Sequence, residues 1–402
     1  MTMADIDRRG FLRLTGAAAA TSVFASACSG SSLGDDKADK GGPVKIGLLL
    51  PQAGVYKGLG DDQRFGWELY LKEHGNKLGG REVKVVTADE ADAPETTKSN
   101  AEKLLKQEKC LTVAGVISSA NLIAIQEMFT EAKVPFVSTN ASPTPVQGKD
   151  YGWRTSFVND HPAVAIGGYA AKNAGGPVAL IAADYAAGHD NIKGFQKSFL
   201  SGGGKVAGEP VLAPFPIGGK SFQPYLQQIE KLKPKAVFAF FAGADAVKFV
   251  KEYKKFGLAA KYPLYAPGFL VEGGVLKAQG PDAEGILNAL HYAHTLDNET
   301  NRKFVARFIE AYDRPPTCFS VAAYDAAAVL DMAIKEAGDD LTSETLEKAL
   351  GKLGDIDSPR GTWKFGKNRS PVQHFYLREV RKDGDKVANV VLEDLGPLGD
   401  DT

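Results

Sequence analysis

The chain has 402 residues, which is too long for one small core and suits two domains of ordinary size. Lys and Arg total 48 against 49 Asp and Glu, so no charge excess points to a nucleic-acid partner. Beyond the signal-like N-terminus no apolar run approaches the roughly 20 residues needed to span a bilayer, so we expect the body of the protein to be soluble.

The N-terminal segment has the layout of a twin-arginine export signal. Arg8 and Arg9 are followed by a Phe-Leu pair and a short Ala-rich stretch, which is too mild for a stable membrane helix. We therefore expect residues 1–27 to be a signal peptide that is removed on export.

Cys28 follows the small residues Ala-Ser-Ala and so resembles the lipidated cysteine of a bacterial lipobox. The alternative is a cysteine behind an ordinary small-residue cleavage site. Residues 28–42 are rich in Ser, Gly, Asp and Lys, which predicts a flexible tether. The expected location is extracytoplasmic, in the periplasm or at the outer face of the plasma membrane, with Cys28 as the lipid anchor.

From Pro43 onward, strand-like segments alternate with helix-like segments. The strands predicted in the first part of the chain are 44–51, 81–89, 112–117 and 135–140, and the helices are 61–74, 93–108 and 119–132. This β-α repetition implies a parallel sheet with helices on both faces.

The same alternation restarts after a short strand at 153–155, and it predicts a second α/β unit between about Asn159 and Tyr292. Its predicted elements are a helix after His161, strands 178–184 and 236–242, and helices 192–199 and 244–256. Further helices are predicted at 299–312, 319–337 and 342–350, and the tail predicts a hairpin that turns at Asp383-Gly384.

Cys110 and Cys318 lie far apart in the sequence, and both have apolar neighbours. We interpret them as small buried residues that remain reduced, although export would permit a disulfide.

A candidate ligand site lies where strand 112–117 runs into a helix through Ser118 and Ser119. The first N–H groups of a helix are unpaired and carry partial positive charge, so with a serine hydroxyl they can hold a carboxylate. The next strand ends in Ser138 to Pro143, which supplies a carbonyl and a hydroxyl nearby. One such serine alone is more often a cap or turn residue, but two hydroxyl-rich strand ends favour a ligand site.

Several segments in this order and spacing resemble the periplasmic-type receptors for branched-chain amino acids and amides. They are LGDDQRFGWEL (59–69), GVISSANLIA (115–124), VPFVSTNASP (134–143), ADYAAG (183–188), DAEGIL (282–287), CFSVAAYDAA (318–327) and RGTW (360–363). The resemblance runs from about Val44 to the C-terminal hairpin.

The resemblance implies the periplasmic-binding-protein type I fold, in which two doubly wound α/β lobes are joined by a three-crossing hinge and close around a ligand. On this basis the N-terminal lobe comprises 43–158 and about 293–368. The C-terminal lobe comprises 159–292 and about 369–396.

The resemblance also implies that hydroxyls at Ser119 and Ser142 hold the ligand carboxylate and that the main-chain carbonyl of Asn140 binds its amino group. The sequence departs from the amino-acid receptors at two positions. Gly268 stands where the second lobe often supplies an acid, and Asn159 replaces another acid near the hinge. A desolvated ammonium without a counter-charge is costly, which disfavours a simple α-amino acid.

The candidate lining is instead aromatic, so an aromatic acid or an amide contends with a branched-chain or other amino acid as the ligand. Each such ring taken singly is more often a core residue. The rings that we assign to the lining are Tyr56, Phe157, Tyr185, Phe241, Phe269, Tyr292 and Phe319.

The predicted function is a monomeric solute receptor that presents a small carboxylate-bearing metabolite to an ABC importer permease, without a cofactor or a metal. An exported enzyme or a ligand-sensing module on the same fold are the alternatives. An enzyme needs a nucleophile–base pair or a metal cluster, and neither occurs at convincing spacing. His291 and His294 are three residues apart but lack acidic or cysteine ligands at metal spacing, so we interpret them as structural.

Overall fold

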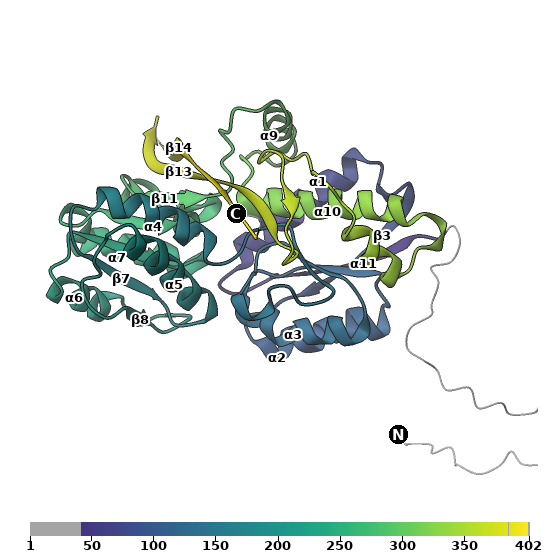
Figure 1. The fold of residues 1–402 in the computed structure, drawn as a ribbon, viewed down its shortest axis with the longest axis horizontal. Helices are drawn as coiled ribbons and strands as arrows, with labels where there is room; N and C mark the ends of the chain where they lie inside the picture. Colours follow the sequence, from purple (N-terminus) through teal and green to yellow (C-terminus); the bar gives the residue numbers. More distant parts are fainter. Residues whose placement is uncertain (1–41, 385, 401–402) are drawn as a thin grey trace, which may run out of the picture. The chain divides into compact units, whose positions relative to one another are not determined.

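A computed structural model describes residues 42–384 and 386–400 (Figure 1). The predicted signal peptide and Cys28 lie outside the described residues, and so does the predicted tether apart from Gly42. Within the described ranges, none of the helices combines the length and the hydropathy that a membrane span requires.

The first sheet is parallel except for a short antiparallel edge, and its strand order is β2-β3-β1-β4-β5-β6. Its strands are β1 (Val44–Leu50), β2 (Lys77–Leu78), β3 (Arg81–Asp89), β4 (Thr112–Gly115), β5 (Phe136–Ser138) and β6 (Gly152–Arg154). The sequence order reverses at β1, which lies between β3 and β4. In doubly wound sheets, ligands bind at the carboxyl ends of the strands beside such a reversal.

Helices cover both faces of this sheet (Figure 1). They are α1 (Lys57–Glu73), α2 (Pro94–Glu102), α3 (Ser119–Ala132), α10 (Cys318–Ala337) and α11 (Ser343–Leu350). Successive side chains of β1 point to opposite faces, which explains its continuous apolar sequence. Leu48 is buried with residues of α1, α10 and α11, whereas Leu49 is buried with residues of α2 and α3. We call this sheet with these helices the first lobe.

The second sheet has the order β12-β13-β11-β10-β9-β7-β8, with β14 added beside β13. Its strands are β7 (Val178–Ala183), β8 (Val211–Ala213), β9 (Ala236–Phe240), β10 (Leu264–Pro267), β11 (Leu287–Leu290), β12 (Lys364–Phe365), β13 (Pro371–Asp383) and β14 (Lys386–Leu398). Strands β7 to β11 are parallel, and β13 is antiparallel both to β11 and to β14. Here the order reverses at β7, between β8 and β9.

The helices that follow these strands are α4 (His161–Asn173), α5 (Ala186–Ser201), α6 (Gln223–Lys231), α7 (Gly243–Lys255) and α8 (Gly273–Gln279). We call the second sheet with these helices the second lobe. Helix α9 (Glu299–Tyr312) packs on α1 through the stacked rings of Tyr312 and Phe65. Short helical turns are η1 (Lys103–Gln107), η2 (Thr144–Val146), η3 (Leu258–Ala260), η4 (Gly268–Val271), η5 (Gly280–Ala283) and η6 (Gly338–Asp340).

The chain passes between the lobes three times, after β6, after β11 and after α11. The first and third crossings are bonded to each other, because the main-chain carbonyl of Ser156 accepts hydrogen bonds from Arg360 (2.9 Å) and Gln373 (2.7 Å). Arg360 is fully buried and forms an ion pair with Asp325 of α10 at 3.0 Å. The two-lobed type I fold is therefore confirmed, while the exact residues at which the lobes divide stay a prediction.

Several elements differ from the sequence-based prediction. Helix α1 begins at Lys57 rather than at residue 61, and α5 begins at Ala186 rather than at residue 192. Strands β8, β10 and β11 had no predicted counterpart, because each has only three or four residues. Both Cys110 and Cys318 are buried and free, as predicted.

Candidate ligand-binding site

A cavity opens beyond the carboxyl ends of the strands of both lobes. It lies beside both points of strand-order reversal, since its lining follows β1, β4, β7 and β9. The lining residues are Tyr56, Leu59, Ile117, Ser119, Asn140, Phe157, Asn159, Tyr185, Ala187, Asn191, Phe240, Ala242, Phe269 and Phe319. None of them carries a formal charge at neutral pH.

Ser119 is the first residue of α3 and is buried. Its Oγ accepts a hydrogen bond from Nδ2 of Asn159 at 3.0 Å. In the described part of the chain the main-chain N–H groups of Ser119 and Ala120 have no protein acceptor, as expected for the first turn of a helix. The cavity wall therefore presents a hydroxyl and the positive end of a helix dipole.

The carboxylate of Glu90, which follows β3, contacts the turn immediately before α3, and the sequence analysis did not anticipate this. Its carboxylate accepts the main-chain N–H groups of Ile117 (2.6 Å) and Ser118 (2.7 Å) and the side-chain amide of Asn121 (2.9 Å). Burial raises the pKa of Glu90 to about 7, although these three donors act in the opposite direction. Two of the N–H groups at this turn are thus already bonded to the protein.

The structure places Asn140 in the cavity wall and Ser142 behind it. The main-chain carbonyl of Asn140 accepts a hydrogen bond from Oγ of Ser156 at 3.0 Å, and its side-chain amide donates to the carbonyl of Ile117 at 2.8 Å. Ser142 is fully buried, its main-chain N–H donates to Oδ1 of Asn159, and its Oγ has no protein partner. Ser142 thus lies beside Asn159 rather than in the cavity lining.

Aromatic rings form the apolar part of the cavity. Phe269 lies 4.6 Å from Phe157, 6.3 Å from Phe319 and 6.5 Å from Phe240, measured between ring centroids. All four rings are buried. Aromatic pairs at such separations contribute about 0.5–1.5 kcal/mol beyond the burial of their area. These rings, which come from both lobes, give the cavity an apolar wall.

A pair of tyrosines completes this wall. The hydroxyl of Tyr56, in the first lobe, donates to the hydroxyl of Tyr185, in the second lobe, at 3.1 Å. Burial raises the pKa of both phenols above the usual value. Both hydroxyls therefore remain protonated and neutral.

Two of the predicted aromatic residues do not line this cavity. Phe241 packs on Phe249 (4.5 Å) and Phe222 (4.9 Å), and the preceding residue, Phe240, faces the cavity instead. Neighbouring side chains at the end of a strand point to opposite faces, which is why Phe240 lines the cavity and Phe241 does not. Tyr292 is fully buried, and its hydroxyl donates to Oδ1 of Asn301 at 2.9 Å.

At Gly268, the position at which the amino-acid receptors often carry an acid, the structure has little room for a side chain. A Cβ atom there would clash with Nη2 of the buried Arg378. His291 is fully buried among rings, 5.6 Å from Phe157, and burial lowers its pKa well below the usual value. Among the residues that the structure describes, no group of three His, Cys, Asp or Glu side chains is placed to hold a metal ion.

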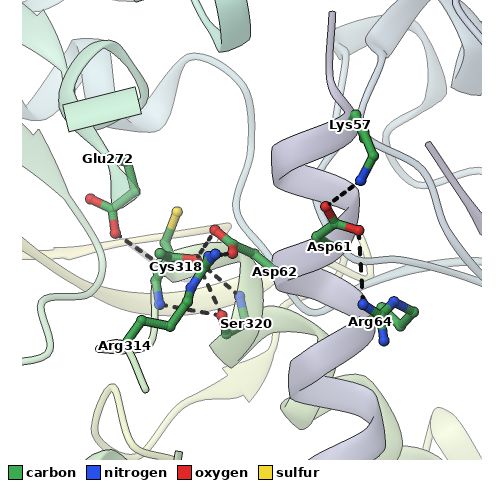
Figure 2. A network of polar contacts seen from close by, with 9 residues as sticks. Lys57, Asp61, Asp62, Arg64, Glu272, Arg314, Cys318 and Ser320 are labelled. Atoms are coloured by element: carbon green, nitrogen blue, oxygen red, sulfur yellow. Dashed lines mark hydrogen bonds and ion pairs between the residues drawn. The ribbon is translucent and has the colours of Figure 1, made fainter. Parts of the chain in front are cut away.

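The first turn of α10, which carries Phe319 into the cavity, is held from both lobes (Figure 2). Glu272, which precedes α8 in the second lobe, accepts the main-chain N–H of Cys318 at 3.1 Å and pairs with Arg378 at 3.0 Å. Asp62 of α1 accepts the hydroxyl of Thr317 at 3.0 Å and forms an ion pair with Arg314. The bond from Cys318 to Glu272 therefore connects the two lobes beside the aromatic wall.

Comparisons with known proteins agree with this architecture. The family model described as "Periplasmic binding protein" matches residues 43–385. A Leu/Ile/Val-binding protein homolog 6 of Brucella melitensis is 32% identical over 349 residues, which cover 85% of this chain and 88% of the relative.

Two solved structures from R. palustris are similar along nearly their whole length. A solute-binding protein of an ABC transporter in complex with benzoate is 37% identical, with a TM-score of 0.82, and the match covers 89% of this chain and 97% of that one. A second, in complex with 4-hydroxybenzoate, is 32% identical, with a TM-score of 0.83, and the match covers 89% of this chain and 98% of that one. The chain therefore belongs to the periplasmic binding protein family, as a two-lobed solute-binding protein of the ABC-transporter type.

Proposed function

We propose that this protein binds a small aromatic carboxylate of the benzoate class between its lobes and delivers it to the permease of an ABC importer. The observation that carries the proposal is the composition of the cavity lining. Buried rings from both lobes surround a hydroxyl and a helix N-terminus, and no acidic side chain lines the cavity.

The polar end of the cavity suits a carboxylate. The hydroxyl of Ser119 and the main-chain N–H groups of Ser119 and Ala120 are donors, and hydrogen bonds from such groups to an ionised carboxylate are stronger than neutral ones. The dipole of α3 adds a favourable interaction with negative charge. We propose that the ligand carboxylate lies here, with its ring among Phe157, Phe269 and Phe319.

The same lining is poorly suited to an α-amino acid. An ammonium group that leaves water needs a negative partner or several good acceptors, and the lining offers no carboxylate. Gly268 has no room for an acidic side chain that could pair with an ammonium group. The benzoate and 4-hydroxybenzoate complexes of the similar R. palustris proteins support an aromatic ligand.

We further propose that the protein is exported by the twin-arginine route, is lipidated at Cys28, and acts as a monomer that binds its ligand without turnover. Membrane retention tests the anchor. Wild-type protein is expected in the membrane fraction, and a Cys28→Ala variant is expected to be released. Retention of that variant would overturn the lipidation.

Calorimetric titration with a matched panel tests the ligand class. Benzoate and 4-hydroxybenzoate are expected to bind with Kd at or below the micromolar range, equivalent to about 8 kcal/mol. Benzamide is expected to bind more weakly because it lacks the charge, and leucine is expected not to bind. Binding of leucine without binding of either benzoate would overturn the proposal and favour the amino-acid alternative.

A further inference from the structure

Asn159 lies at the first crossing between the lobes, and its side-chain amide uses all of its hydrogen-bonding groups. Nδ2 donates to Oγ of Ser119 at 3.0 Å and to Oδ2 of Asp190 at 3.1 Å. Oδ1 accepts the main-chain N–H of Ser142 at 3.1 Å. Only 3% of the residue is exposed, so water does not compete for these bonds.

The partners fix which end of the amide faces Ser119. A main-chain N–H can only donate, so Oδ1 must face Ser142. The carboxylate of Asp190 accepts from the main-chain N–H and the hydroxyl of Thr144, at 3.2 and 3.0 Å, and because it can only accept, the amide group that faces it from Asn159 must be Nδ2. Nδ2 is therefore directed at Ser119 for two independent reasons.

This arrangement decides how the hydroxyl of Ser119 can act. Its oxygen already accepts a bond from Nδ2 of Asn159, so its proton does not point at that residue. No other protein acceptor receives this proton within the described residues, and Ser119 lines the cavity. The hydroxyl is thus left as a donor toward the ligand.

We propose that Asn159 is a positioning residue that, by holding the Ser119 hydroxyl as a donor, makes the cavity prefer an anionic head group over a neutral one. The inference rests on the proposed benzoate-class ligand. It assigns the selectivity of the cavity to Asn159, a residue that need not contact the ligand. Asp190, which belongs to the second lobe, supports the same orientation.

The substitution Asn159→Asp reverses the direction of the hydrogen bond between residue 159 and Ser119, while the side chain keeps nearly the same shape. An ionised carboxylate at this position has no proton to give, so the Ser119 hydroxyl turns to donate to it and is lost to the ligand. If the new carboxyl group is protonated, it gives its single proton to Asp190, which leaves Ser119 in the same reversed state. In either case the anion loses its hydroxyl donor.

Binding of benzoate and of benzamide to the variants tests the inference. For Asn159→Asp we expect benzoate affinity to fall about tenfold to hundredfold, with a much smaller change for benzamide. Asn159→Ala is expected to cost less than Asn159→Asp, because the Ser119 proton stays free. In a Ser119→Ala background, Asn159→Asp is expected to cause little further loss of benzoate affinity. If Asn159 had only a structural role, its substitution would weaken binding whether or not Ser119 was present.

The double variant Asn159→Asp with Asp190→Asn covers the case in which two adjacent acids prevent folding. It keeps the net charge and lets residue 190 donate to residue 159, and it is still expected to lose the preference for benzoate. Asp190→Asn alone is the matched control and is expected to keep that preference, because Ser142 still fixes the amide.

The outcomes separate the two claims. If wild-type protein does not bind benzoate, the proposed function fails and this inference with it. If wild type binds benzoate but the folded double variant keeps the wild-type ratio of benzoate to benzamide affinity, only the role of Asn159 is overturned.

Discussion

The hydroxyl of Tyr56 donates a hydrogen bond to the hydroxyl of Tyr185, and the two oxygens, one from each lobe, lie 3.1 Å apart. The ring of Tyr185 also stacks on Phe215, with centroids 4.2 Å apart. Ligand contacts that involve both lobes shift the balance between open and closed arrangements toward the closed one. This bond is therefore expected to contribute to affinity without contacting the carboxylate.

We predict that Tyr56→Phe weakens benzoate binding about two- to tenfold, because it removes one neutral hydrogen bond and keeps the ring. Calorimetry measures the change. Tyr253→Phe is the matched control, since its hydroxyl bonds to the carbonyl of Tyr262 within the second lobe, away from the cavity. An unchanged Kd for Tyr56→Phe would contradict a role for the pair in closure.

Ser119→Ala is predicted to weaken benzoate binding about tenfold or more, since a hydrogen bond to a charged group is lost. Its unfolding midpoint is expected to stay close to that of wild type. Ser118→Ala provides the neighbouring control, because the Ser118 side chain makes no capping bond and does not line the cavity. Equal affinities for both variants would place the carboxylate elsewhere.

Benzoate affinity is predicted to be higher at pH 6 than at pH 8. Burial raises the pKa of Glu90 to about 7, so its neutral form accumulates below that pH and does not repel an anion bound at the adjoining helix N-terminus. His161 stays neutral across this window, because burial lowers its pKa to about 4. Titrations in buffers of different ionisation enthalpy are expected to show proton uptake on binding. A flat profile would exclude this coupling.

The same shift has a consequence for stability without ligand. The folded pKa of Glu90 lies above that of an unfolded glutamate, so the folded state binds more protons between about pH 4.5 and 7. The free energy of unfolding is therefore predicted to fall as pH rises through that window. Denaturant melts at several pH values give the slope of the unfolding free energy against pH for wild type and for Glu90→Gln. Equal slopes for the two proteins would count against Glu90 as the source of the pH dependence.

Glu272→Ala is predicted to lower the free energy of unfolding by about 3–5 kcal/mol, because it leaves the buried guanidinium of Arg378 without its partner. The side chains of Glu272 and Arg378 are only 7% and 1% exposed. Asp61→Ala serves as the control in urea melts. The side chains of Asp61 and Lys57, which form an ion pair (Figure 2), are 33% and 57% exposed, and such a pair contributes about 0–1 kcal/mol. Similar losses in the two variants would contradict the assigned role.

The sequence was sufficient to predict the elements that have long apolar runs. The runs at 44–50, 178–183 and 236–240 are strands that are buried on both faces, so their composition alone marks them. Strand β10, in contrast, has four residues and ends in Pro267, and no periodicity can be read from so short a segment. Its pairing with β9 and β11 decides its conformation.

The sequence predicts the segments of the candidate site better than the directions of its side chains. It points to the turn at Ser119 because a strand running into a helix through serines is a local pattern, and Ser119 lines the cavity. The sequence pattern points to Phe241, whereas Phe240 lines the cavity, because the phase of alternation at a strand end depends on packing. Glu90 was missed, although it directly follows β3, whose carboxyl end lies at the same sheet edge as that of β4.

A crystal structure of the protein grown with benzoate tests the central claim most directly. We predict that the benzoate carboxylate lies within hydrogen-bonding distance of Oγ of Ser119, with its ring among Phe157, Phe269 and Phe319. Benzoate bound outside this cavity, or turned with its carboxylate toward the phenyl rings, would contradict the account.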